Sequence, residues 1–277
     1  KQIITILPPV TGGFVTMTET ATIGDYAPVH IKGTSKNDVI LTNRTGTGTP
    51  GLATLISSPG GTTTYEYVGM PIELSDMTIW VDQASVNGSG IILAGNVTMR
   101  DMNLFYKSTV ASKGCVRYER NTGDVTKWAV PTLIAENVTF FADTDMACFY
   151  IDTDSLVFSS MNSAYSVEGD SGSVVAFASA ANCYNQPYFF GDQYYLRTSW
   201  ARIIESIGTQ QDQKVLSYGC YFFGANPVTF SNVVQDAGSG FTGWAGDVVL
   251  YYSGDAIYPP PKLRNIGVPI KVSYGPK

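Results

Sequence analysis

Three charged residues in the middle of the chain have the types and spacing of a carbohydrate-cleaving site. Glu119 follows the apolar run 115–118, and Asp152 follows a similar run at 146–151. Glycoside hydrolysis uses two carboxyl groups about 5 to 9.5 Å apart, and equivalent residues of neighbouring strands are about 4.8 Å apart. Arg117 lies two residues before Glu119, so a strand presents both on one face. Glu119 and Asp152 are therefore a candidate catalytic pair, with Arg117 placed to steady an anionic sugar or intermediate.

The same carboxylates also have a simpler interpretation. Asp143 and Asp145 on one side, and Asp152 and Asp154 on the other, flank a single apolar run, as solvated turn residues do. The only histidine, His30, lies between apolar residues, which favours a packed structural role and leaves no second imidazole for Ser-His-Asp or Cys-His chemistry. Four dispersed Cys and one His lack the spacing of a zinc site. No metal or cofactor is expected, and whether any bond is cleaved stays open.

Aromatic residues beside the irregular insertions suggest a surface that binds sugars. The chain contains 17 Tyr and 4 Trp, more than its core positions require. Aromatic rings stack on the apolar faces of sugars, while Tyr hydroxyls bond to sugar oxygens. The alternative is that many of these rings fill the interior or a seam between subunits. The residues that we expect to line a groove are Trp128, Tyr150, Tyr195 and Trp200.

These residues must be held by a repeating element, because a polar residue followed by an apolar one recurs at intervals of roughly 22 to 36 residues. Around Asp76, apolar residues alternate with period two on both sides, but the phase shifts at Asp76 itself. Such a shift indicates a tight corner between two strands. Asn, Asp and Ser suit corners because they tolerate left-handed backbone. The polar members of the repeat are Asp76, Asp101, Asn137, Ser160, Asn182, Ser206, Asn232 and Asn265.

The repeat predicts an all-β solenoid. A third apolar run lies about a dozen residues before most corners, which gives three strands per coil. We therefore expect a three-sheeted parallel β-helix of about eight coils over residues 71–277. Residues 1–70, in which Thr and Gly crowd positions 42 to 61, are expected to form an N-terminal cap with a first, degenerate coil. The groove would run along the face made by the third strands.

Composition excludes several partners. Only 14% of the residues are charged, against roughly 25% in ordinary soluble domains, so the surface suits a neutral partner or further copies of the chain. The net charge of -6 and the absence of a Lys/Arg cluster argue against nucleic acid. No run approaches 18 apolar residues, so no membrane span is expected. The four cysteines lie at apolar places of the repeat, where free, buried thiols are favoured over disulfides.

The coil pattern, apolar residues alternating with spacers before Asn-Val at Asn137, resembles that of right-handed parallel β-helix proteins over residues 70–270. This superfamily includes pectate-lyase-like enzymes, polygalacturonases and bacteriophage tailspikes. The Gly-His-Gly and Arg-Ile-Lys strings of polygalacturonases are absent, and residues 121–124, Asn-Thr-Gly-Asp, only echo their Asn-Thr-Asp. The charge-poor, Thr- and Tyr-rich composition is most similar to that of a phage tailspike or tail-fibre head.

This resemblance implies a homotrimer in the phage virion that binds, and in some members cleaves, bacterial capsule or O-antigen polysaccharide. Because the chain opens on Lys1, it also implies a preceding part that joins the rest of the tail. Two alternatives remain open: a secreted pectate-lyase-like lyase or hydrolase, and a structural or adhesin β-helix module.

Overall fold

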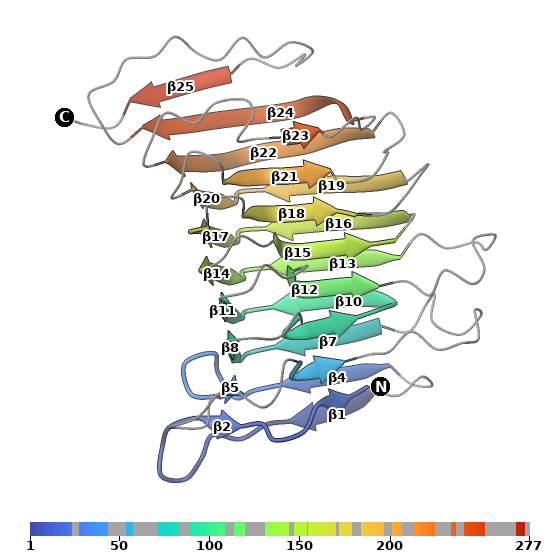
Figure 1. Cartoon of the computed structure of the whole chain (residues 1–277), viewed down its shortest axis with the longest axis vertical. Coiled ribbons are helices and arrows are strands. Elements are labelled where there is room, and N and C mark those ends of the chain that lie inside the picture. Colours follow the sequence, from blue (N-terminus) through green and yellow to red (C-terminus); the bar gives the residue numbers. More distant parts are fainter. Residues whose placement is uncertain are drawn as a thin grey trace.

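Every regular element in the described part of the chain is a β-strand, and all strand pairs are parallel. The computed structural model describes residues 1–23, 28–43, 54–57, 71–83, 89–108, 114–119, 131–143, 147–153, 155–169, 172–178, 184–196, 201–206, 213–224, 234–236, 241–252 and 270–274. The strands form three stacks along one long axis (Figure 1). A search of these residues finds no helix of the length and apolarity that crossing a membrane requires. The predicted class, an all-β three-sheeted parallel β-helix, is confirmed.

Each coil contributes one strand to each stack. The first stack contains β1 (Gln2–Thr5), β4 (Val29–Lys32), β7 (Pro71–Ser75), β10 (Asn96–Arg100), β13 (Thr132–Glu136), β16 (Ser155–Met161) and β19 (Tyr184–Phe190). The second contains β2 (Val15–Thr16), β5 (Ile40–Thr42), β8 (Thr78–Gln83), β11 (Asn103–Ser108), β14 (Thr139–Asp143), β17 (Ala164–Val167) and β20 (Gln193–Leu196). The third contains β3 (Ala21–Thr22), β6 (Ile56–Ser57), β9 (Ile91–Leu93), β12 (Gly114–Glu119), β15 (Ala147–Asp152), β18 (Ser173–Phe177), β21 (Arg202–Ser206) and β23 (Val234–Asp236).

About five coils, from β7 to β21, are regular, and the coils at both ends are not. At the N-terminal end, β2, β3 and β6 have only two residues each. At the C-terminal end, β22 (Gln213–Gly224) and β24 (Phe241–Tyr252) run without a break from the first stack into the second. The last strand, β25 (Ile270–Tyr274), pairs with β24. The regular coils thus number about five, fewer than the eight or so expected over residues 71–277.

A left-handed residue makes the corner between the first and second stacks. Asp76, Asp101, Asn137 and Asn162 have φ between 51° and 56°, and Gly191 has φ 66°. Non-Gly residues rarely adopt this conformation, and Asn and Asp tolerate it best. Each corner N–H donates to the carbonyl that precedes the next corner, as Asn137 does to Met161 at 2.9 Å. The Asn137 side-chain amide also donates to the Asp101 carboxylate, so a side-chain ladder links these two coils.

The corner prediction is correct at Asp76, Asp101 and Asn137 and wrong at Ser160 and Ser206. Ser160 lies inside the coil two residues before the true corner, and its hydroxyl is 2.7 Å from the Tyr165 hydroxyl. Ser206 ends β21, in the third stack. The remaining predicted corner residues, Asn182, Asn232 and Asn265, lie outside the described residues.

The core is the space that the three stacks enclose. Inward residues of the first regular coil are aliphatic or Met, and buried rings such as Tyr106 and Tyr118 join them from the next coil onward. Phe140, Tyr165 and Tyr194 occupy equivalent places on β14, β17 and β20, with ring centroids 6.3 and 5.7 Å apart. Cys115, Cys148 and Cys220 are free and buried, in agreement with the sequence interpretation. Stacking of like residues therefore fills the interior coil by coil.

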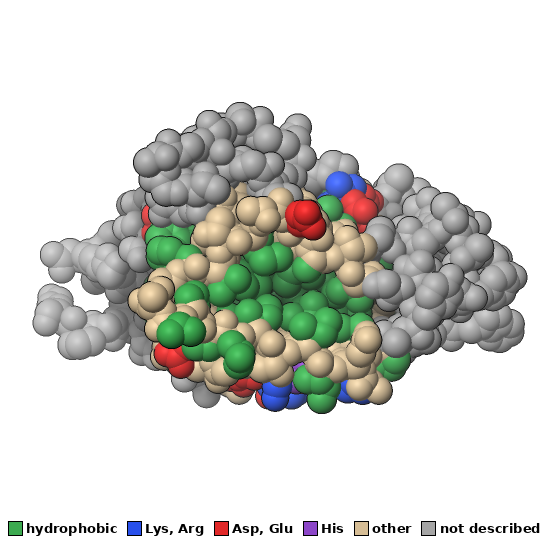
Figure 2. All heavy atoms as spheres, turned by 90° about the horizontal axis from the view of Figure 1, so that it is seen from below, with side chains coloured by type: hydrophobic (Ala, Val, Ile, Leu, Met, Phe, Trp, Pro, Cys, Tyr) green, Lys and Arg blue, Asp and Glu red, His purple; other side chains and the backbone are tan. Residues whose placement is uncertain are grey.

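The N-terminal end of the solenoid leaves its apolar interior open. Figure 2, which views the molecule from that end, shows hydrophobic side chains across the centre of a polar rim. Ile3 and Leu7 are 59% and 67% exposed. Strand β1 pairs with β4, and β4 pairs in turn with β7, so strands from both sides of the predicted boundary at residue 70 pair with one another. Residues 1–70 thus contribute strands to the same three stacks as the rest of the chain.

Candidate functional site

The three predicted catalytic residues lie together on the outer face of the third stack. Glu119 and Asp152 end β12 and β15 and are register partners, while Arg117 is paired with Tyr150. The guanidinium of Arg117 contacts the Glu119 carboxylate and lies 3.3 Å from Asp152 Oδ2. All three side chains are between 25% and 38% exposed, so solvent reaches them. One cation therefore bridges two neighbouring carboxylates.

Tyr150 and Glu205 extend this cluster along the third stack. Burial raises the pKa of Tyr150, and the carboxylates of Asp152 and Glu205 raise it further, while Arg117 opposes them. The Tyr150 hydroxyl therefore keeps its proton at neutral pH and can act as a hydrogen-bond donor. Ser173 Oγ lies 3.5 Å from Glu205 Oε2, longer than an ordinary O–H···O hydrogen bond. The cluster thus presents three carboxylates, one guanidinium and one phenol.

The geometry of this cluster favours ion pairing over acid catalysis. A general acid needs a carboxyl group that apolar surroundings keep protonated while its partner stays ionised. Here one cation, Arg117, contacts both Glu119 and Asp152. His30 is remote from the cluster, on β4, where its Nε2 lies 2.9 Å from Ser75 Oγ. Burial lowers the pKa of His30, in keeping with a packed structural residue.

Of the four residues predicted to line one groove, the two that the structure describes lie on different stacks. Tyr150 belongs to the third stack, but Tyr195 is on β20 in the second stack, where its hydroxyl donates to Gln193 Oε1 at 2.9 Å. The expectation that Tyr195 lines the third-strand face is therefore wrong, because the strand after the Gly191 corner belongs to the second stack. Trp128 and Trp200 lie outside the described residues.

A column of outward aromatic rings runs along the second stack instead. Trp80, Phe105 and Phe141 are register partners on β8, β11 and β14. Their ring centroids are 6.3 Å apart at each step. Phe14 adds an edge-on contact to Trp80 at 5.6 Å, at the N-terminal end of the column. An exposed apolar surface that spans consecutive coils normally marks an interaction site.

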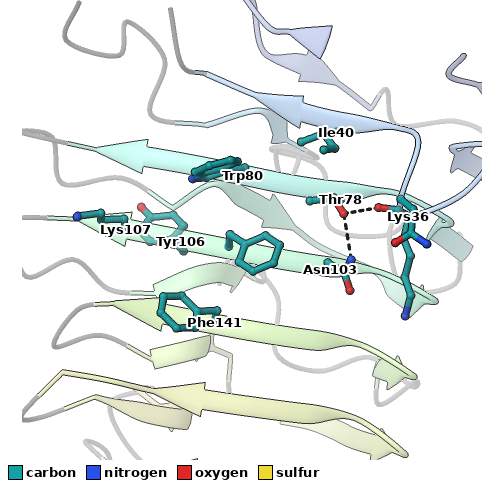
Figure 3. Close-up of a pocket in the computed structure, with 10 residues that line it drawn as sticks. Lys36, Ile40, Thr78, Trp80, Asn103, Tyr106, Lys107 and Phe141 are labelled. Carbon is teal, nitrogen blue, oxygen red and sulfur yellow. Dashed lines mark hydrogen bonds between the residues drawn. The ribbon is translucent and has the colours of Figure 1, made fainter. Parts of the chain in front are cut away.

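A hollow of about 530 Å³ opens beside this aromatic column. Figure 3 shows the ring of Trp80 on β8 and the ring of Phe141 on β14, with β11 between these two strands. Lys36 comes from the segment before β5, and Ile40 is the first residue of β5. This volume is in the range of small-ligand sites, which are largely apolar with a few fixed polar groups. The described lining residues are Lys36, Asn37, Ile40, Thr78, Trp80, Asn103, Phe105, Tyr106, Lys107 and Phe141.

The polar groups of the hollow are held by a short hydrogen-bond chain. Asn103 Nδ2 donates to Thr78 Oγ1 at 3.2 Å, and Thr78 Oγ1 donates to the Lys36 carbonyl at 2.5 Å. The Thr78 N–H donates to the Val39 carbonyl at 2.8 Å, so the segment before β5 is attached to β8 twice. The side of the hollow formed by Lys36 is therefore fixed relative to the aromatic column.

This hollow was missed by the sequence analysis, although part of its signal was present. Trp80, Phe105 and Phe141 are each the fourth residue after a corner, at Asp76, Asp101 and Asn137. Reading the same place in every coil would have identified the column. No group of three or more His, Cys, Asp or Glu side chains suited to a metal ion occurs among the residues described.

Comparisons with protein-family models, with curated proteins and with solved structures find no match to this chain. The strand pairing alone defines the class of this protein, which is a three-sheeted parallel β-helix.

Proposed function

We propose that the protein binds polysaccharide along the outer face of its second stack. The observation that carries this proposal is the column of Trp80, Phe105 and Phe141, one ring per coil, beside an open hollow. Sugar rings have apolar faces that stack on aromatic side chains. A ring repeated along the solenoid axis offers such contacts to successive residues of one glycan chain. The low charge of the surface favours a neutral or weakly charged polymer.

The test compares two exposed phenylalanines on different stacks. Phe105 and Phe190 are each 38% exposed, but Phe190 lies on β19 in the first stack. Binding of the full chain to a panel of bacterial capsule and O-antigen polysaccharides would be measured by affinity electrophoresis. Trp80→Ala and Phe105→Ala should each weaken binding about two- to tenfold, because an aromatic contact contributes roughly 0.5–1.5 kcal/mol. Phe190→Ala should bind as the unaltered chain does.

Two results would reject the proposal. One is indifference of the unaltered chain to every polysaccharide in the panel, which would leave a structural or adhesin module. The other is equal loss of affinity in the Phe105 and Phe190 variants, which would show that the second stack has no special role. Circular dichroism of each variant would separate loss of binding from loss of fold.

We further propose that the chain acts as the receptor-binding part of a phage tailspike-like homotrimer. The support is the coil pattern together with an apolar outer face on the first stack. There Ile134, Met161 and Tyr188 are partly exposed. Such a face suits contact with further copies of the chain. A monomer mass at micromolar concentration, measured by sedimentation for a chain with both ends intact, would count against the trimer.

Cleavage of the bound glycan is the second candidate function, supported by the register pairing of Glu119 with Asp152. It would make the protein a depolymerase, either on a virion or as a secreted lyase or hydrolase. Glu119→Gln and Asp152→Asn distinguish the two functions, since neither residue touches the aromatic column. Turnover that these changes abolish while binding persists establishes an enzyme. If the unaltered chain and both variants bind the polysaccharide equally and none of them cleaves it, the protein is a binding module.

A further inference from the structure

We propose that the hollow beside Trp80 takes the acetamido group of an N-acetylated sugar. This inference rests on the proposed polysaccharide binding and names the class of sugar that the second stack selects. It is drawn from the orientation of one amide, the apolar walls and the charge at the rim.

The orientation of the Asn103 amide is fixed by its neighbours. A threonine hydroxyl has a single proton, and Thr78 donates it to the Lys36 carbonyl at 2.5 Å. The Thr78 oxygen can then only accept, so the Asn103 NH₂ group must face it, as the 3.2 Å contact shows. The Asn103 carbonyl oxygen is consequently turned away from Thr78 (Figure 3). The amide therefore offers the hollow an acceptor and requires a donor from the ligand.

The walls around this acceptor are apolar. Trp80, Phe105 and Phe141 line the hollow along the second stack, and Ile40 of β5 lies beside Thr78 on the same outer face. A group that satisfies both features must carry an N–H donor next to a small apolar substituent. The acetamido group has this composition, because its N–H can bond to the Asn103 carbonyl while its methyl group packs against the rings. A sugar with only hydroxyl groups could donate to this acceptor and stack its ring on the column, but it would bring no methyl group to pack against the rings beside the acceptor.

The charge at the rim argues against an unacetylated amino sugar. Lys36 lines the hollow, and its ammonium group has no carboxylate partner in the described part of the chain. A sugar ammonium placed there would face the like charge of Lys36, which is unfavourable. Acetylation removes that positive charge. The volume of about 530 Å³ also leaves room for the sugar ring that bears the substituent.

The experiment compares acetylated and plain sugars on the full, unaltered chain. N-acetylglucosamine and N-acetylgalactosamine would be titrated against glucosamine, glucose and galactose, with saturation-transfer NMR to locate the contacting protons. At least one N-acetylated sugar should bind about tenfold more tightly than its parents, with its acetyl methyl protons receiving the strongest transfer. Equal binding of acetylated and plain sugars, transfer centred on ring protons, or no binding of either N-acetylated sugar would overturn the inference.

A matched pair of variants adds a second measurement. Asn103→Leu removes the acceptor at nearly constant volume and should reduce the preference for the acetylated sugar at least fivefold. Gln193→Leu removes an amide at the equivalent place of β20, away from the hollow, and should leave the preference unchanged. If polysaccharide binding depends on Trp80 but N-acetylated sugars bind no more tightly than plain ones, this inference is rejected while the proposed function stands. Absence of binding to every glycan rejects both.

Discussion

The stability of the fold should fall as pH rises from 5 to 8, because an aspartic acid is enclosed in the solenoid. Asp192 follows the Gly191 corner and is 0% exposed. Its Oδ1 accepts the Ser163 N–H at 2.8 Å, and the Tyr194 hydroxyl donates to Oδ2 at 3.2 Å. Burial raises the pKa of Asp192 from 3.8 to about 7, and these hydrogen bonds only partly oppose the shift. The folded chain therefore holds a proton that the unfolded chain releases.

The sign and size of the effect follow from this difference in pKa. Below about pH 4 the carboxyl is protonated in both states, and its contribution to stability is fully present. As pH rises towards 7, only the unfolded state ionises, so the free energy of unfolding falls until the folded pKa is passed. A shift of about three units corresponds to about 4 kcal/mol in total, since each unit is worth about 1.4 kcal/mol. Between pH 5 and pH 8 the expected loss is about 2–3 kcal/mol.

Asp192→Asn isolates this contribution, because asparagine keeps an acceptor for the Ser163 N–H and does not titrate. Urea unfolding at pH 5 and at pH 8 would give the change in the free energy of unfolding between the two pH values, once for the variant and once for the unaltered chain. The variant should lack the 2–3 kcal/mol fall that the unaltered chain shows. Asp38→Asn, an Asp-to-Asn change at an exposed residue, should retain it. A variant whose stability falls with pH as steeply as that of the unaltered chain would refute the reasoning.

Two further perturbations test the corner and the core. Asn137→Leu should destabilise the fold by about 1–3 kcal/mol in urea unfolding, because the amide bonded to Asp101 is lost and leucine disfavours a φ of 53°. Asn137→Gly, which accepts that φ, should cost less, and the reverse order would contradict a left-handed corner. Burial raises the pKa of the Cys115 and Cys148 thiols, so both should react with an aromatic disulfide reagent only after urea unfolds the chain. Prompt reaction of either thiol in the native state, measured by peptide mapping, would show that the third stack opens locally.

The parallel β-helix was predictable because its corners repeat a local chemical signal. Asp76, Asp101 and Asn137 are each followed by a buried apolar residue, namely Met77, Met102 and Val138. This pattern, a polar corner residue followed by an apolar one, does not continue in the next two coils. There the corners are Asn162 and Gly191, and the residues that follow them are Ser163 and Asp192. These two residues are buried and bond to each other, so a polar contact fills the place that apolar residues fill elsewhere. Asn162 is followed by a polar residue, whereas Ser160 precedes the apolar Met161, so Ser160 fits the pattern better and the sequence predicts it as the corner instead.

The candidate site was predictable only in part, for a different reason. Neighbouring coils bring Glu119 and Asp152 together by strand register, which the spacing of the runs implied. The hollow depends on the segment before β5, which lies ahead of the first recognisable corner. That segment is attached to β8 because Thr78 donates hydrogen bonds to the backbone carbonyls of Lys36 and Val39. Every residue has a backbone carbonyl, so residue types do not indicate which carbonyl is bonded. Long-range contacts of this kind cannot be read from a repeat.

The stacking of the coils also determines how the molecule carries mechanical load. The hydrogen bonds between coils point along the long axis, so tension between the two ends acts on the coil interfaces in series. Additional coils then add length without adding strength, and the weakest interface yields first. At the N-terminal end β2 and β5 share only two register pairs, against seven for β16 and β19. A glycan lying across Trp80, Phe105 and Phe141 would bridge three consecutive coils and reinforce their interfaces from outside.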